Sequence, residues 1–261
     1  MNKINVAEFE EEIIFNELNF AVIEFEGKDG AINKKGEIII PFEYSHLIDF
    51  DEQTELILAC NSENFWGFIN WKNETIIPFD YSYASIFSED YNLSAVCKNG
   101  KYGCINRNNQ EIIPIEYDSI TSISFDKMGV CKNQKWGIIN LQNQQIIDFK
   151  YDFAICVTKN IYYVGKQVDE KLEDYDLETD LLTFKDGKLI KFGLIDEKEN
   201  LLMDYESYLT SDYFGNNKVL AFDFPKYENY LFDIKSKEKI YAPIEMDEDE
   251  KIEYLKSLLK K

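Results

Sequence analysis

The stretch Trp136-Gly137-Ile138-Ile139-Asn140, with Ile147 and Asp148 following it, decides the fold because similar stretches recur along the chain. The other copies are Asp29-Gly30-Ala31-Ile32-Asn33, Trp66-Gly67-Phe68-Ile69-Asn70, Tyr102-Gly103-Cys104-Ile105-Asn106 and Phe192-Gly193-Leu194-Ile195-Asp196. Eleven residues after the glycines come, in chain order, Pro41, Pro78, Pro114, Asp148 and Asp204. The first four glycines are 37, 36 and 34 residues apart, and the fifth follows after 56. A period of this length is typical of stacked supersecondary units.

Within one repeat the hydrophobic pattern has the period of two that is typical of β-strands. In the third repeat, residues 93–98 and 101–106 read as strands joined by Asn99-Gly100, a type I′ hairpin signal. Residues 111–113 read as a third strand, which Pro114 ends because proline lacks the N–H that a central strand needs. We therefore expect a three-stranded antiparallel meander in each repeat, followed by a linking arm.

The fold class predicted is all-β, an array of about six such meanders. A weak sixth copy without the glycine spans 219–244, as terminal repeats often depart from the consensus. The domain boundaries expected are an N-terminal helical cap at 1–18, repeats at 19–245 with an insertion at about 160–182, and an amphipathic helix at 246–261. Terminal caps favour an open, twisted β superhelix. A closed, propeller-like ring is the alternative, since closure removes sheet edges.

Each repeated residue type has a physical reason. The glycine, which weakens a strand, is expected to admit a bulge or the close approach of the aromatic residue that follows the proline of an adjacent repeat. Trp66, Trp136, Tyr102 and Phe192 precede glycines and are expected to be core wedges between repeats, with ligand-stacking platforms as the alternative. The asparagine or aspartate three residues after the glycine is expected to open a turn by bonding its own backbone.

The motif Trp-Gly-x-Ile-Asn, a turn, Glu-Ile-Ile-Pro and Tyr-Asp resembles the bacterial WG (KWG) repeat family. It is nearly complete at Lys135 to Asn140, Trp66 to Tyr81 and Lys101 to Asp118. The resemblance implies a β-rich array used for interactions, with no shared catalytic motif and hence no catalytic residues to assign. Departures from it are Asp29, Tyr102 and Phe192 at the tryptophan position, and Asp148 and Asp204 at the proline position.

The charge balance indicates the class of partner. The chain has 28 Lys and Arg against 49 Asp and Glu, a net charge of −21. Such a chain repels nucleic-acid phosphates, and its charge suits either solubility, as a solvated acidic surface, or attraction to a basic protein partner. No apolar run is long enough for a membrane span, and the N-terminus lacks a signal-peptide core, so we expect a cytoplasmic protein.

No residue pattern points to catalysis, a cofactor or a metal. Five cysteines without close pairs are expected to be reduced core residues. The single histidine, His46, is expected at the surface or in a turn. Phosphate-binding glycine loops and nucleophile elbows are absent from the sequence. Among so many carboxylates, a glycosidase-like pair has no distinguishing signal.

The acidic insertion is the candidate partner-binding segment, because insertions in repeat arrays often lie on the binding face. Its candidate residues are Asp169, Glu170, Glu173, Asp174, Tyr175, Asp176, Glu178 and Asp180. The function expected is that of a non-enzymatic protein-binding scaffold, in particular an acidic immunity protein that blocks a basic toxin domain. The alternatives are a carbohydrate-active hydrolase on a propeller-like scaffold and a self-associating structural protein. A solvated charge run is the simpler interpretation of the acidic residues.

Overall fold

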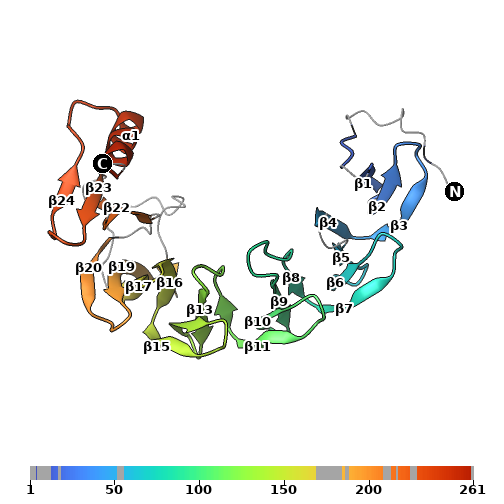
Figure 1. The fold of residues 1–261 in the computed structure, drawn as a ribbon, viewed down its shortest axis with the longest axis horizontal. Coiled ribbons are helices and arrows are strands. Elements are labelled where there is room, and N and C mark those ends of the chain that lie inside the picture. The colour runs from blue at the N-terminus through green and yellow to red at the C-terminus, as the bar shows by residue number, and fades with distance from the viewer. Residues whose placement is uncertain are drawn as a thin grey trace. The chain divides into compact units, whose positions relative to one another are not determined.

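The computed structural model describes residues 4, 13–16, 19–51, 56–168, 184–185, 188–207, 213–215, 217–223 and 228–259. The chain forms two compact units, residues 1–117 and 118–261, which we call unit 1 and unit 2. In both units the described residues are mainly β-strands, and consecutive strands lie side by side in small sheets (Figure 1).

Unit 1 holds three antiparallel sheets in its described part, and the strands of each follow chain order. Sheet 1 consists of β1 (Phe20–Phe25), β2 (Lys28–Asn33) and β3 (Ile38–Tyr44). Sheet 2 consists of β4 (His46–Asp51), β5 (Leu56–Cys60), β6 (Trp66–Ile69) and β7 (Thr75–Tyr81). Sheet 3 consists of β8 (Tyr83–Ala84), β9 (Ser94–Lys98), β10 (Lys101–Ile105) and β11 (Glu111–Tyr117).

Unit 2 also holds three antiparallel sheets in its described part. Sheet 4 consists of β12 (Ser119–Ile120), β13 (Lys127–Lys132), β14 (Lys135–Asn140) and β15 (Gln145–Tyr151). Sheet 5 consists of β16 (Phe153–Thr158), β17 (Ile161–Val168), β18 (Phe184–Lys185), β19 (Lys188–Asp196) and β20 (Leu201–Ser207). In this sheet β17, β18 and β20 all pair with β19. Sheet 6 consists of β21 (Tyr213–Gly215), β22 (Lys218–Asp223), β23 (Glu228–Asp233) and β24 (Lys239–Tyr241). The all-β class and the six antiparallel repeats are thus confirmed, whereas the open form of the array stays a prediction.

The linking arm of the predicted repeat is itself a strand. In sheets 2 to 5 it forms β4, β8, β12 or β16, the first strand of the sheet. The backbone N–H groups of Ser45 and Ser82 donate to the carbonyls of Cys60 and Cys97, at 2.8 and 2.9 Å, and begin this pairing. The arms were not recognised as strands because some are only two residues long and lack a clear alternation of polar and apolar residues.

The turns match the chemistry expected from the sequence. Asn99 and Gly100 have φ values of 54° and 74°, the left-handed pair that a type I′ turn needs. In the next turn, Asn106 Oδ1 accepts the backbone N–H groups of Asn108 and Gln110, both at 3.0 Å. The same side-chain bonds form at Asn33, Asn70, Asn140 and Asp196. The repeated asparagine is therefore a structural residue of the turn, as predicted.

Replacing Asn106 by alanine is expected to lower the free energy of unfolding of unit 1 by about 1–2 kcal/mol, because two backbone N–H groups lose their acceptor. Asn106→Asp is the control, since Asp196 makes the same two bonds in sheet 5. Urea denaturation measures both variants. Equal losses for alanine and aspartate would contradict the role of the side-chain oxygen.

The repeat glycine permits a close approach within its own sheet. A Cβ at Gly103 would lie 2.5 Å from the carbonyl oxygen of Ile113, and one at Gly137 would lie 2.6 Å from that of Ile147. Both carbonyls belong to the third strand of the same repeat, where the pairing register shifts at a bulge. The bulge was predicted correctly. The adjacent repeat was the wrong partner, because the tight asparagine turn brings the proline segment back against its own glycine strand.

The core consists of clusters between neighbouring sheets. Between sheets 2 and 3 it contains Leu58, Phe68, Val96 and Ile105, and half-buried Trp66 packs against this cluster. Trp136 packs in the same way on the cluster between sheets 4 and 5. These contacts confirm the expected wedge role of the two tryptophans.

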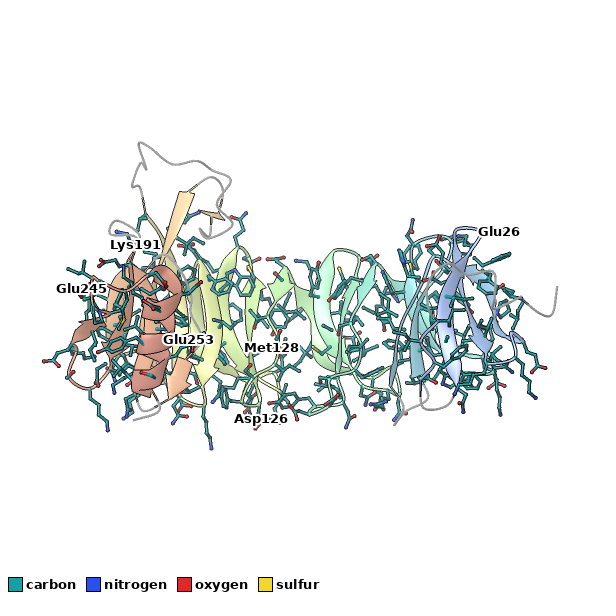
Figure 2. The ribbon with its side chains drawn as sticks, turned by 90° about the horizontal axis from the view of Figure 1, so that it is seen from above. Glu26, Asp126, Met128, Lys191, Glu245 and Glu253 are labelled. Carbon is teal, nitrogen blue, oxygen red and sulfur yellow. The ribbon has the colours of Figure 1, made fainter. Side chains whose placement is uncertain are left out.

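The C-terminal helix is confirmed as α1 (Glu248–Leu259). Asp247 and Glu250 form the predicted capping box: Asp247 Oδ1 accepts the N–H of Glu250 at 2.8 Å, and Glu250 Oε2 accepts that of Asp247 at 3.3 Å. Leu255 is fully buried against sheet 6, and Glu253 lies on the exposed face (Figure 2). Most of the predicted N-terminal helix lies outside the described residues, and 13–16 carry no regular secondary structure.

Candidate protein-binding surface

The predicted binding segment, Asp169 to Asp180, lies outside the described residues, but the strands on either side of it are described. In sheet 4 the hairpin β13–β14 ends one pair beyond the Cys131–Trp136 pair, at Lys132 and Lys135. In sheet 5 the equivalent pair is Gly165–Phe192, and pairing continues through Lys166–Lys191, Gln167–Ile190 and Val168–Leu189. The acidic segment is therefore joined to the far end of an unusually long hairpin.

The base of this hairpin carries positive charge, which the sequence interpretation did not foresee. Lys166 Nζ lies 4.2 Å from the centre of the Tyr205 ring. Lys191, on the extended part of β19, pairs with Lys166 (Figure 2). The lysines would have been visible in the sequence, but their common position depends on the strand pairing.

A second surface of mixed character lies on the third strands of unit 1. Glu43, Asp80 and Glu116 occupy equivalent positions and are exposed. On β7 and β11 the exposed isoleucines Ile76 and Ile112 precede the buried ones. Residues 1–117 contain 8 Lys and Arg against 21 Asp and Glu, so negative charge is concentrated in this unit as well as in the insertion.

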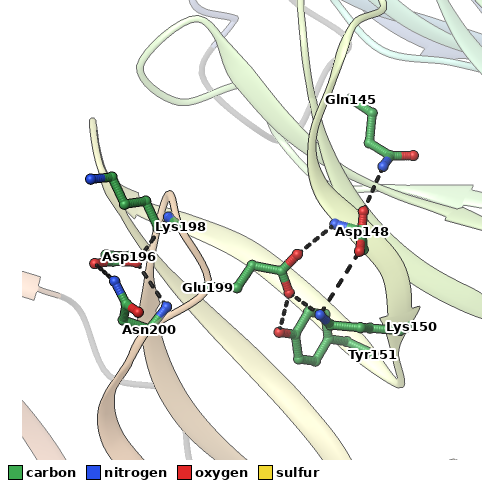
Figure 3. A network of polar contacts seen from close by, with 8 residues as sticks. All are labelled: Gln145, Asp148, Lys150, Tyr151, Asp196, Lys198, Glu199 and Asn200. Carbon is green, nitrogen blue, oxygen red and sulfur yellow. Dashed lines mark hydrogen bonds and ion pairs between the residues drawn. The ribbon is translucent and has the colours of Figure 1, made fainter.

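A connected polar cluster joins sheets 4 and 5 (Figure 3). Glu199 lies at the tip of the β19–β20 turn. Its carboxylate accepts a 2.7 Å hydrogen bond from Tyr151 Oη and forms an ion pair with Lys150. The backbone N–H of Asp148 donates to the same carboxylate at 3.5 Å. Glu199, Lys150 and Tyr151 were not predicted as a group, because only the fold shows that these positions of successive repeats touch.

The pKa shifts in this cluster follow from its contacts. Partial burial acts to raise the pKa of Glu199, but the hydrogen bonds from Lys150 and Tyr151 and the ammonium charge lower it overall. Burial and the bond to Glu199 raise the pKa of Tyr151. Asp196 and Asp233 also have lowered pKa values, the first mainly through Asn200 and the second through the N–H of Ser236. A hydrolase acid needs a raised carboxyl pKa, and these three shifts run the other way.

Acid is expected to weaken the Glu199 cluster. Because the folded-state pKa of Glu199 lies below its ordinary value of 4.5, its contribution to stability is present above pH 4.5 and is lost as pH falls through the folded-state pKa. The difference in unfolding free energy between the wild type and Glu199→Gln should therefore be constant well above pH 4.5 and shrink as the pH falls below 4.5. Urea titrations at several pH values measure it. A constant difference would contradict the assignment.

The remaining candidate residues have structural surroundings. All five cysteines are free and buried, as predicted, and burial raises the pKa of Cys104 and Cys156 to about 12. His46 is exposed, as predicted, and stacks on Trp66 with ring centres 6.0 Å apart. No group of potential metal ligands occurs among the residues that the structure describes. Within that same part, no helix has the length and apolarity to cross a membrane.

The fold defines a β-rich repeat scaffold. The family model described as the WG containing repeat matches residues 30–60, 66–102, 102–136 and 136–166, about half of the chain. The chain belongs to this family. The four matches coincide with repeats one to four of the sequence pattern, which confirms the resemblance.

The comparisons with curated proteins and with solved structures do not identify a function. A comparison with curated proteins finds no match. Among solved structures, Kluyveromyces lactis Hsv2 is 10% identical, with 85% of this chain and 72% of that chain covered and a TM-score of 0.43. The WD40 β propeller domain of Doa1 is 10% identical, with 85% of this chain and 77% of that chain covered and a TM-score of 0.35. BamB from Moraxella catarrhalis is 8% identical, with 87% of this chain and 71% of that chain covered and a TM-score of 0.38. Similarities this low carry no information on function.

Proposed function

We propose that the chain is a non-enzymatic scaffold that binds a basic protein, and that it acts as an immunity protein which neutralises a basic toxin domain. The observation that carries this proposal is the long β17–β19 hairpin, whose strands lead into the acidic segment 169–180. Ile190 in the extended part of the hairpin is buried in the core cluster that sheets 5 and 6 share, and the last extra pair, Val168–Leu189, leads directly into the acidic segment. A hairpin that is anchored in this way and carries the acidic segment at its far end favours a role in binding.

The charge of the molecule supports the choice of partner. A net charge of −21 accelerates encounter with a positively charged protein and repels nucleic acid. A nuclease toxin domain, which carries basic residues to bind phosphates, has the complementary charge. Binding of the acidic protein over such a surface would block access of the nucleic acid to it.

The test compares two variants with the same change in net charge. In the first, Asp169, Glu173, Asp174 and Asp176 become lysine; in the control, the exposed residues Glu26, Glu63, Glu89 and Asp90 become lysine. The basic protein captured by the wild type is purified, and its affinity for each variant is measured by calorimetry. We expect at least about a hundredfold loss for the first variant and a small loss for the control.

Three results would count against the proposal. Unchanged affinity of the hairpin variant would exclude the acidic segment as the binding face. Equal losses in both variants would indicate attraction by net charge alone. Failure of the chain to protect cells that produce the captured protein would exclude the immunity function.

A further inference from the structure

The joint between sheets 4 and 5 differs from the corresponding joints in unit 1. In unit 1, Tyr44 Oη donates to Asn73 Oδ1, and Tyr81 Oη donates to Asn109 Oδ1, both at 2.7 Å. Each asparagine sits at the turn of the following sheet with a φ of 59°. Glu199 has the same φ and the same tyrosine partner, but a carboxylate replaces the amide.

Asparagine and glutamate impose different requirements on the neighbouring strand. An amide both accepts and donates, so Asn73 accepts from Tyr44 while its Nδ2 donates to Glu43 at 3.2 Å. A carboxylate only accepts, and an acid in the place of Glu43 would repel it. The chain has Lys150 at that position, and this lysine forms an ion pair with Glu199.

The proline position of the repeat is the third one that differs at this joint, and the difference again favours the carboxylate of Glu199. Pro41, Pro78 and Pro114 have no backbone N–H to offer, whereas Asp148 at the equivalent position donates its N–H to Glu199. Asp148 also accepts from Gln145 Nε2 at 2.8 Å and lies 3.9 Å from Lys150 Nζ (Figure 3). Asp148, Lys150 and Glu199 therefore fit one another, whereas β3, β7 and β11 have a proline and an acid at the positions of Asp148 and Lys150.

We propose that the Asp148–Lys150–Glu199 cluster is a recognition device that fixes the order of the repeats, so that repeat 5 stacks on repeat 4 and on no other repeat of the same or a second copy of the chain. If the Glu199 turn stacked on β3 or β11, its carboxylate would face Glu43 or Glu116 and a proline. On β7 it would face Pro78 and Asp80, a carboxylate that already forms an ion pair with Lys98 at 2.9 Å. If the Asn73 turn stacked on β15, its amide N–H would face the ammonium group of Lys150. Each wrong pairing brings together like charges or two donors.

The device has a physical purpose. Sequences that repeat closely tend to exchange equivalent elements between copies, and domain swapping is a characteristic failure of repeat proteins. Specificity between similar surfaces requires contacts that penalise the wrong partner as well as contacts that favour the right one. The charge inversion at this joint supplies both.

The test uses the double variant K150E/E199N, which copies the Glu43–Asn73 arrangement of unit 1. Each single substitution should lower the folding equilibrium constant about tenfold, because it leaves a charge or a donor without its partner. The double variant should recover most of this loss. Recovery would show that the two positions act as a pair; losses that simply add would overturn the pairing.

The second readout is repeat order. Wild type, the double variant and E199Q are refolded from urea at high protein concentration, and light scattering coupled to chromatography measures the dimer fraction. We expect the double variant to form roughly threefold more dimer than the wild type, because its repeat 5 now also fits the acids of unit 1. E199Q removes the charge with little change in shape and should shift the same way. Dimer fractions equal to that of the wild type in both variants would overturn the proposal.

Discussion

Gly103→Ala is expected to destabilise unit 1 by about 3 kcal/mol, at the upper end of the range for overpacked sites. The added Cβ would lie 2.5 Å from the carbonyl oxygen of Ile113, 2.7 Å from that of Pro114 and 2.8 Å from the N atom of Ile115. These are backbone atoms of the bulge, so relief requires a shift of the whole third strand. Alanine gains only about 0.5–1 kcal/mol over glycine in a strand. The crowding therefore outweighs the gain.

The matched control is Gly100→Asn, three residues earlier in the same sheet. No atom lies within 4 Å of a Cβ at Gly100, and asparagine tolerates its φ of 74°. We expect a loss of less than about 1 kcal/mol for this variant. Urea denaturation followed by circular dichroism measures both. A loss at Gly103 no larger than that at Gly100 would mean that the bulge yields, and that the repeat glycine has another role.

Local patterns in the sequence predicted most of the fold. The spacing from Gly137 to Asp148 recurs as a unit, and the Asn99-Gly100 and Asn106 turns define where strands reverse. These features depend on residues close in the chain, so periodicity and turn chemistry capture them. Tyr83–Ala84 was missed as a strand because its pairing with β9 depends on residues more than ten positions away.

Contacts between repeats were harder to predict. The replacement of proline by Asp148 was visible as a departure from the motif, but its meaning depends on Glu199, fifty-one residues later. Aligning the copies would have revealed that Lys150 and Glu199 both depart from the other repeats. Only the stacking of sheet 5 on sheet 4 shows that they meet. The acidic segment that the sequence favoured for binding stays a prediction.

Leu255→Ala is expected to destabilise the C-terminal end of unit 2 by about 2–4 kcal/mol, because the substitution leaves a cavity in a fully buried site. Leu255 is 0% exposed and packs with Leu220 and Leu231 of sheet 6, while the other apolar residues of α1 at this contact, Tyr254 and Leu258, are only partly buried. Leu255 is therefore the main buried contact between α1 and sheet 6. An isolated helix of 12 residues is marginal in water, so α1 should lose helical structure once this contact weakens.

Hydrogen exchange distinguishes local release of the helix from general destabilisation. In Leu255→Ala, the amides of α1 and of β22 and β23 should exchange faster, while those of sheet 4 keep their protection. Glu253→Ala is the control, since Glu253 is exposed and its ion pair with Lys256 at 3.0 Å is worth less than about 0.5 kcal/mol. If Leu255→Ala exposed sheets 4 to 6 together, unit 2 would unfold as one cooperative body and α1 would be part of its core. If exchange were unchanged throughout, the helix would not cover sheet 6 in solution.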